Sequence, residues 1–326
     1  MGGAARRERI VRPISAAIFS DRKTNGAQRN PREGALQTSP MKLMTGAMAA
    51  GPGHESAFFT LHPSATPDLT AALLSNTTSW PQASGYYWQQ SRRPLTCLAF
   101  VAPLLVLYEG GVLWLGAQAM RNGADVWLRQ SLDLLGFGQY FLLPALAIGI
   151  LLGWHHTTQQ PWRVSLGVLY AMWAECLLLA LALVVIARLQ GALLSMVLPA
   201  SDQWPPPAAV FDGTLGLGGK LVSFFGAGIY EEVLFRLMLL PLAAAGLRWA
   251  GCTPRQALVG AVIATSILFS AAHYIGPHGQ SFDASSFTFR LVAGGFFGVL
   301  FAYRGFGVAA GTHALYDILV GLCAAA

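Results

Sequence analysis

The chain has 326 residues, of which 54% are hydrophobic and only 11% are charged. This composition is too apolar and too poor in charge for an ordinary soluble domain, and it indicates a membrane protein. The formal net charge of +6 does not indicate a nucleic-acid partner, because residues 95–326 hold equal numbers of acidic and basic side chains. The whole excess lies in residues 1–94, where eleven Lys and Arg stand against five Asp and Glu.

Residues 1–94 are rich in Arg, Ser, Thr, Pro, Gly and Ala, and they show no sustained hydrophobic periodicity. This composition predicts a disordered basic tail, followed by a membrane-spanning part at residues 95–326. Basic residues ahead of a first span usually face the cytoplasm and its anionic lipids. The four cysteines form no C-x-x-C pair, so they favour neither a disulfide framework nor a cysteine-type zinc site.

From residue 95 onward, long apolar runs alternate with short polar breaks. A helix needs about 20 apolar residues to cross the hydrocarbon core, and lipid leaves only helices or closed barrels as spanning structures. The runs are continuous rather than alternating, so they predict an all-α polytopic bundle of about seven transmembrane helices. The predicted spans are residues 95–118, 134–153, 164–187, 217–247, 256–276, 287–303 and 305–324. The fourth is long for one span, and Pro241 is able to kink or divide it.

Basic residues in the polar breaks set the predicted orientation of the bundle. If seven spans alternate, most of the arginines in the breaks fall on the same side as the basic tail, and most of the aspartates fall on the other. Cytoplasmic loops carry the excess of Lys and Arg in membrane proteins. The N-terminus is therefore predicted to be cytoplasmic and the C-terminus external.

The fourth predicted span contains three charged residues, Glu231, Glu232 and Arg236. An ionised side chain at the centre of a bilayer costs about 2.5–3.5 kcal/mol, so such groups persist where they pair, contact water or do chemistry. Glu232 and Arg236 are four residues apart, in the favourable order for a structural ion pair. Glu231 is rotated about 100° from Glu232 and has no partner on its own face of the helix. It is either a general base that acts on water or a buried structural acid.

Two later spans also carry ionisable side chains. His273 ends the fifth run, where a single histidine is most often structural. His313 and Asp317 share one face of the last span, so they can hold a metal ion, a water or a substrate oxygen, or simply bond to each other. Each residue alone has a structural explanation, but three apolar spans with Glu or His together favour a hydrolytic or metal site.

Three motifs follow one another on these spans: Glu231-Glu232-x-x-x-Arg236, Phe269-x-x-x-His273 and His313-x-x-x-Asp317. Over about residues 217–324 they resemble the E-E-x-x-x-R, F-x-x-x-H and H-x-x-x-N/D pattern of the CAAX prenyl protease and bacteriocin-processing (Abi) family. The resemblance implies an intramembrane endopeptidase of the glutamate or metal type, similar to type II CAAX endopeptidases. Glu231 and His273 would then activate a water, while His313 and position 317 would stabilise the oxyanion or hold a metal. Glu232, Arg236 and Phe269 would support the site.

The resemblance also sets the expected surroundings of the protein. We expect it in the lipid of the bacterial inner membrane, with a peptide or a membrane protein as substrate and no nucleic-acid partner. The pattern fits both a site without a cofactor and one that holds a divalent metal such as zinc at Glu231, His273, His313 and Asp317. Asp317 departs from the members with Asn, because an ionised carboxylate cannot donate a hydrogen bond to an oxyanion. It is expected to be protonated, to orient His313 or to bind a metal.

Two other functions fit parts of the sequence. One is a non-catalytic immunity or scaffold protein, because several relatives act in self-protection against bacteriocins; the intact set of three motifs argues against it. The other is a small proton-coupled transporter that uses Glu109, Glu175 and Glu231 as a relay. The sequence has no convincing internal repeat of the kind that transporters carry. Glu109 and Glu175 are therefore interpreted first as groups that pack helices together or share protons.

Overall fold

The computed structural model describes residues 80–116, 119, 121–138, 140–197, 216–276 and 279–323. Within these ranges all regular structure is helical, which confirms the predicted all-α fold. Residues 1–79 of the predicted tail lie outside the described residues. Residues 80–91, predicted as irregular, instead form helix α3 (Trp80–Ser91). Contacts with the bundle stabilise α3: the hydroxyl of Tyr87 donates to Glu175, and the Arg304 guanidinium lies 3.7 Å from the Trp88 ring centre.

Helices occupy all seven predicted runs, and one further helix, α5, lies between the first and second runs. In chain order after α3 the elements are α4 (Pro94–Leu115), α5 (Gly123–Leu134), α6 (Leu142–Thr157), α7 (Leu166–Val197), α8 (Leu217–Gly226), η4 (Ala227–Glu231), η5 (Val233–Leu239), α9 (Leu240–Trp249), α10 (Pro254–Ala272), α11 (Ala284–Arg304) and α12 (Phe306–Cys323). Among the described helices, α4, most of α7, α10 and α11 are long and apolar enough to cross a membrane. Helix α6 is apolar but shorter.

The fourth predicted run is one unbroken helix from residue 217 to residue 249. It is not divided at Pro241, which stands in the first turn of α9. The irregularity lies ahead of the proline, where η4 and η5 are wound as wider π-helical turns. Proline cannot donate a backbone hydrogen bond to the preceding turn, and π-helical turns inside α-helices are frequent at functional sites. Glu231 and Arg236 both lie in these turns.

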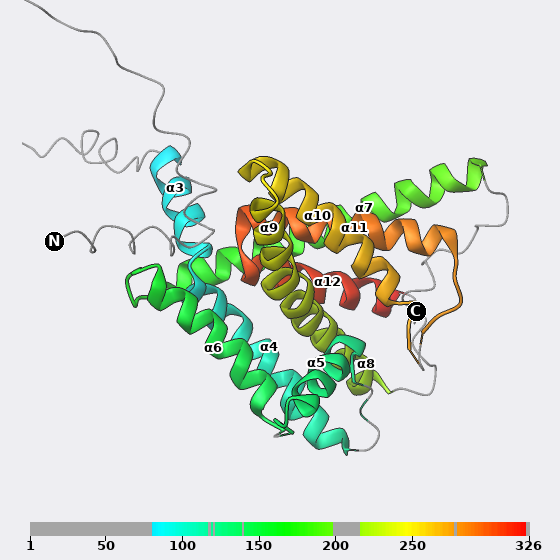
Figure 1. Ribbon diagram of the computed structural model, residues 1–326, viewed down its shortest axis with the longest axis horizontal. Helices are drawn as coiled ribbons and strands as arrows, with labels where there is room; N and C mark the ends of the chain where they lie inside the picture. The colour runs from blue at the N-terminus through cyan, green and yellow to red at the C-terminus, as the bar shows by residue number, and fades with distance from the viewer. Residues whose placement is uncertain are drawn as a thin grey trace, which may run out of the picture. The chain divides into compact units, whose positions relative to one another are not determined.

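Helix α12 is central to the bundle and packs against α4, α7, α8, η4 and α11 (Figure 1). Every residue from 306 to 314 is buried. The chain enters α12 through a sharp turn at Gly305, whose φ of 87° belongs to the left-handed region that favours glycine. Because α12 touches η4 directly, the polar residues of these two elements are placed face to face inside the bundle.

Candidate active site

A glycine allows η4 and α12 to approach closely. A Cβ atom added at Gly228 would lie 2.6 Å from the Cβ of Ala314 and 2.7 Å from its backbone nitrogen. Such distances are too short for any other residue unless the helices move apart. Gly228 lies three residues before Glu231, and Ala314 directly follows His313, so this contact brings the two ionisable side chains together.

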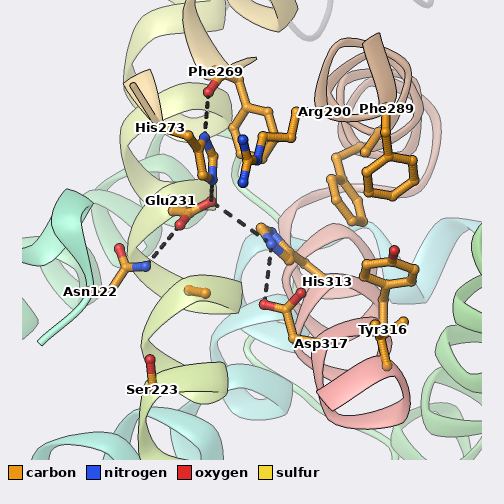
Figure 2. A pocket seen from close by; sticks show the side chains of 14 residues that line it. Asn122, Ser223, Glu231, Phe269, His273, Phe289, Arg290, His313, Tyr316 and Asp317 are labelled. Atoms are coloured by element: carbon orange, nitrogen blue, oxygen red, sulfur yellow. Dashed lines mark hydrogen bonds and ion pairs between the residues drawn. The ribbon is translucent and has the colours of Figure 1, made fainter. Parts of the chain in front are cut away.

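Glu231 is the residue on which the site converges (Figure 2). Its side chain is buried, and Oε1 accepts a hydrogen bond from Nδ2 of Asn122 at 2.8 Å. Oε2 has no hydrogen-bond partner; it lies 4.0 Å from Nε2 of His273 and 3.9 Å from Nε2 of His313. These distances are too long for direct hydrogen bonds but suit a single bridging atom. The predicted convergence of the glutamate with both histidines is confirmed, while their catalytic roles remain a prediction.

His273 caps the C-terminal end of α10 and is fixed by its own helix. Its Nδ1 lies 2.8 Å from the carbonyl oxygen of Phe269. A carbonyl oxygen only accepts, so Nδ1 carries the proton and Nε2 of the neutral ring is left as an acceptor that faces Glu231. The Phe269 ring packs edge-on against His273, with centroids 5.1 Å apart, and the guanidinium of Arg236 lies 4.5 Å from its centre. Phe269 therefore supports the histidine and covers the buried cation.

His313 is held by Glu232, which the sequence had paired with Arg236 alone. Glu232 Oε1 lies 3.0 Å from Arg236 Nη1, as predicted, and also 2.8 Å from His313 Nδ1. Because a carboxylate accepts, Nδ1 carries the proton and Nε2 of His313 is directed towards Glu231. The ring of His313 stacks on Phe297, with centroids 4.5 Å apart and an interplanar angle of 14°. The second glutamate thus orients a histidine as well as balancing an arginine.

Asp317 lies in the site but does not form the expected hydrogen bond to His313. Its Oδ2 is 3.6 Å from His313 Nε2, within ion-pair range but beyond hydrogen-bond distance. The bond that fixes the ring comes from Glu232 on another helix. The interpretation of Asp317 as the residue that orients His313 is therefore weakened, and its carboxylate is left facing the cavity.

A cavity of about 180 Å³ joins these side chains. Its lining consists of residues from η4, α8, α10, α11 and α12, together with the cap of α5: Asn122, Ser223, Ala227, Glu231, Phe269, His273, Phe289, Arg290, Ala293, Phe297, His313, Tyr316, Asp317 and Val320. All four predicted catalytic residues are in this lining. Of the polar lining residues that were not predicted from the sequence, Asn122 bonds to Glu231 and Arg290 carries a charge.

Asn122 and Arg290 differ in whether the sequence alone could have indicated them. Asn122 stands in a polar break with no pattern around it; its Oδ1 accepts from the backbone of Ala124 as the N-cap of α5. Arg290 lies inside the sixth predicted span and violates the same cost rule that singled out Glu231. A search of every predicted span for charged side chains would therefore have identified Arg290. Among the described residues, no group of three or more His, Cys, Asp or Glu side chains is arranged to hold a metal ion.

The other two intramembrane glutamates lie outside the cavity lining. Glu109 accepts hydrogen bonds from Arg129 at 3.0 and 3.3 Å and from the hydroxyl of Tyr230. Glu175 pairs with Arg304 through two bonds of 2.5 and 2.6 Å. Both acids therefore tie helices together through ion pairs, which is the role that the sequence favoured for them.

Comparison with known proteins gives one match. Residues 215–319 match the model of the family described as type II CAAX prenyl endopeptidase Rce1-like. No match to the chain was found among curated proteins or among solved structures. The matched segment contains all three motifs and every predicted catalytic residue, whereas Asn122 lies outside it. The family resemblance indicated by the motifs is confirmed: residues 215–319, which carry the site, are similar to the type II CAAX prenyl endopeptidase Rce1-like family.

Proposed function

We propose that the protein is an intramembrane endopeptidase in which Glu231 activates a water for attack on a peptide carbonyl. One observation carries the proposal: Oε2 of Glu231 is buried, has no hydrogen-bond partner and faces two imidazole nitrogens at about the separation that one bridging atom requires. Glu232 also has one buried oxygen without a partner, but of these two acids only Glu231 lines the cavity. The similarity of residues 215–319 to a peptidase family supports the same reaction.

The proposed reaction moves one proton through the glutamate. A water between Glu231 Oε2 and His273 Nε2 loses a proton to Glu231 as its oxygen attacks the carbonyl carbon, and the carbonyl oxygen becomes an oxyanion. Glu231 then returns the proton to the leaving nitrogen as the carbon–nitrogen bond breaks. His313, as an imidazolium stabilised by the carboxylate of Glu232, donates its Nε2 hydrogen to the oxyanion.

Several side chains position these groups without reacting. Asn122 holds Oε1 of Glu231 and leaves Oε2 directed at the histidines. Arg236 balances the charge of Glu232, and its Nη2 donates to the carbonyl oxygen of Gly294 at 3.1 Å, which joins the pair to α11. Fixed partners of this kind keep a reacting group in its productive geometry.

The proposal extends to the setting of the site. We propose a bundle at residues 95–326 in the bacterial inner membrane, with a cytoplasmic N-terminal tail at residues 1–94. The reaction is proposed to need no metal, and a divalent ion held by Glu231, His273, His313 and Asp317 is the alternative. The substrate class is a peptide segment that reaches the cavity from the membrane or its surface.

The test is cleavage of a quenched-fluorescence peptide library by the purified full-length protein in lipid nanodiscs. We expect cleavage by the wild type, none by Glu231→Gln and undiminished cleavage in the presence of EDTA. Arg248→Gln, which changes an exposed cation on α9, is the matched control and should cleave at the wild-type rate. A folded wild type that cleaves no peptide, or a Glu231→Gln protein as active as the wild type, would contradict the proposal.

A further inference from the structure

Arg290 is a buried cation that the proposed reaction leaves without a role. It lies in the first half of α11, is only 2% exposed and lines the cavity with Glu231 and His273. Its Nη2 donates to Oε1 of Gln280 at 2.6 Å, and its guanidinium carbon lies 5.3 Å from the centre of the Tyr274 ring. Its Nε and Nη1 are buried and have no hydrogen-bond partner. Two nitrogens of the guanidinium therefore keep unused N–H donors.

The two other buried arginines among the described residues are each matched by a carboxylate. Arg236 pairs with Glu232, and Arg304 pairs with Glu175. No ion pair joins Arg290 to any acidic side chain that the structure describes. A buried charge without a partner is strongly destabilising. The fold therefore bears a cost at Arg290 that helix packing does not explain, and a negative charge that arises during the reaction would offset it.

The guanidinium of Arg290 is held beside the proposed water-activating pair, Glu231 and His273. The backbone nitrogen of Gln280 donates to the carbonyl oxygen of His273 at 3.0 Å, and the Gln280 side chain holds Nη2 of Arg290. Arg290 is also close enough to Glu231 for their charges to interact, although the two do not form an ion pair. The N–H donors of Arg290 are thus fixed near this pair before any substrate binds.

The proposed reaction otherwise supplies a single donor to the oxyanion, the Nε2 hydrogen of His313. An ionised Asp317 cannot donate a hydrogen bond. The oxyanion forms on the carbon that the water attacks, so it lies close to Oε2 of Glu231 and to Nε2 of His313. In the view of Figure 2, His313 lies between Arg290 and Asp317, and Asp317 Oδ2 is 3.6 Å from the Nε2 of His313. Arg290 and position 317 are therefore two places in the lining from which a second donor can reach the oxyanion.

We infer that Arg290 is a catalytic residue that donates an N–H of Nε or Nη1 to the oxyanion, beside the hydrogen bond from His313. The inference rests on the proposed peptidase function and adds to it the second donor that an ionised Asp317 cannot provide. As the water oxygen bonds to the carbonyl carbon, its proton passes to Glu231. The electron pair of the carbonyl double bond moves onto the carbonyl oxygen, where the guanidinium balances the new charge.

Arg290 keeps its own protons throughout this reaction. When the carbon–nitrogen bond breaks, the carbonyl double bond reforms and the leaving nitrogen takes the proton from Glu231. The cation is then again without a partner, as it was before the substrate was bound. A donor that is held in place beforehand costs no reorganisation when the charge develops, so its interaction with the oxyanion lowers the barrier.

The first test compares kcat and KM of Arg290→Met with those of the wild type, on a library-selected peptide in lipid nanodiscs. Methionine is similar in length to arginine but has neither a donor nor a charge. We expect kcat to fall about 10²–10³-fold and KM to change less than about threefold, because the oxyanion exists only in and near the transition state. Arg290→Lys keeps a charge and donors and should retain more activity, and Arg248→Gln should keep the wild-type values. A wild-type kcat in Arg290→Met, or a raised KM with kcat unchanged, would overturn the inference.

A second substitution distinguishes a lost donor from a distorted fold, with rates compared at equal amounts of folded protein. In the Arg290→Met background, Asp317→Asn should raise kcat at least about tenfold, because its amide supplies a donor beside the same nitrogen of His313. In the wild type, where Arg290 already donates, the same change should have little effect. The unfolding temperature of Arg290→Met should equal or exceed that of the wild type, because an unpaired buried charge is removed. A double variant no more active than Arg290→Met would overturn the inference.

A binding measurement keeps the two proposals distinguishable. Two pools of short peptides differ in a single group: in one pool a phosphinate, which is a tetrahedral anion like the intermediate, replaces one amide. Each pool is added to the protein in nanodiscs with EDTA present, so that no metal ion binds the phosphinate, and the shift in thermal unfolding is recorded. We expect the phosphinates to give the larger shift in the wild type but not in Arg290→Met.

Each outcome bears on one proposal or the other. If the wild type cleaves no peptide but shows this preference, binding of the tetrahedral anion by Arg290 stands and the peptidase proposal fails. If the wild type cleaves peptides but shows no preference, or if Arg290→Met keeps the preference, the inference fails and the peptidase proposal stands. A wild type with neither cleavage nor preference would refute both.

Discussion

The bundle contains two buried polar clusters, which differ in whether their carboxylate oxygens all have hydrogen-bond partners. In the α4–α5 cluster, made of Glu109, Asp125, Arg121, Arg129 and Tyr230, each acid is held by at least one arginine. Every buried carboxylate oxygen of that cluster that the structure describes has a hydrogen-bond partner. In the candidate site, by contrast, Glu231 and Glu232 each have one buried oxygen without a partner. Of these two acids only Glu231 lines the cavity.

The comparison separates structural acids from reactive ones within the same hydrophobic bundle. Both clusters bear the cost of charge in an apolar environment, so the presence of an acid in a span does not by itself identify a function. Both carboxylate oxygens of Glu109 already accept hydrogen bonds, so neither is free to bind a water or pass a proton. Glu109 instead stabilises the contact between α4 and α5. An acid that leaves an oxygen facing a cavity stabilises the fold less and is available for chemistry.

The largest effect is expected from the pair of substitutions Glu231→Gln and Glu109→Gln. Glu231→Gln should lower kcat by about 10²–10⁴-fold, the usual contribution of a general base, with little change in thermal stability. Glu109→Gln should lower the unfolding temperature but leave kcat within about tenfold when equal amounts of folded protein are compared. The measurement is cleavage of a library-selected peptide, with circular dichroism of each variant in detergent.

This comparison fails if the two substitutions have the same effect. Equal inactivation by Glu109→Gln in well-folded protein would mean that the α4–α5 cluster takes part in the reaction, as a proton relay would require. Normal turnover by Glu231→Gln would mean that its unpartnered oxygen has no chemical role.

The second expected effect concerns stability within the site. Glu232→Gln should lower the free energy of unfolding by about 3–5 kcal/mol, because Arg236 loses its only ion-pair partner among the described residues. Glu109→Gln should cost less, since Arg129 keeps Asp125 at 2.6 Å. Denaturant titration of both variants in detergent measures the difference. A Glu232→Gln protein as stable as the wild type, or less affected than Glu109→Gln, would contradict the assignment of Glu232 as a structural acid.

The sequence predicted the features that follow from one helix at a time. Lipid forces every span to be helical and apolar, so hydropathy located the runs, and the four-residue spacing placed Glu232 beside Arg236. Partners on other helices carry no such signal. The spacing of His313 and Asp317 suggested a hydrogen bond between them, whereas in the structure His313 bonds to Glu232, 81 positions away.

Asn122 and Arg290 were not predicted as site residues, for two different physical reasons. Asn122 comes from a short polar break and reaches Glu231 over a separation of 109 positions, which no periodicity reveals. Arg290 did carry a signal, a charge inside a predicted span, but its relation to the site depends on how α11 packs against α10. Helix α5 was missed because it is short and amphipathic and lies in a predicted loop, where packing rather than hydropathy determines the structure.

A smaller effect is expected from Asn122, the residue by which α5 contacts the site. Asn122→Ala removes the hydrogen bond to Glu231, so kcat/KM should fall about tenfold, as is typical when a supporting partner is lost. It also removes the N-cap of α5, at a cost of about 1 kcal/mol. Asn122→Asp keeps a capping acceptor but cannot donate to Glu231. We therefore expect Asn122→Asp to retain most of the stability and to lose activity; equal activity of wild type and both variants would exclude a positioning role.

The smallest effect is expected at Asp317, where the two mechanisms differ most clearly. Because Glu232 rather than Asp317 makes the hydrogen bond to His313, Asp317→Asn should change kcat/KM by less than about threefold, or about 0.6 kcal/mol. An amide at this position is similar in size and can donate to an oxyanion, which an ionised carboxylate cannot. If Asp317 is a metal ligand, its loss should lower kcat/KM tenfold or more. EDTA should then inactivate the wild type until a divalent ion is restored. The wild type and Asp317→Asn are therefore both assayed before treatment with EDTA, after it, and again after zinc is added. A wild type inactivated by EDTA, rescued by zinc and matched by an inactive Asp317→Asn protein would replace the glutamate mechanism with a metal-dependent one, in which the unpartnered oxygen of Glu231 is a ligand.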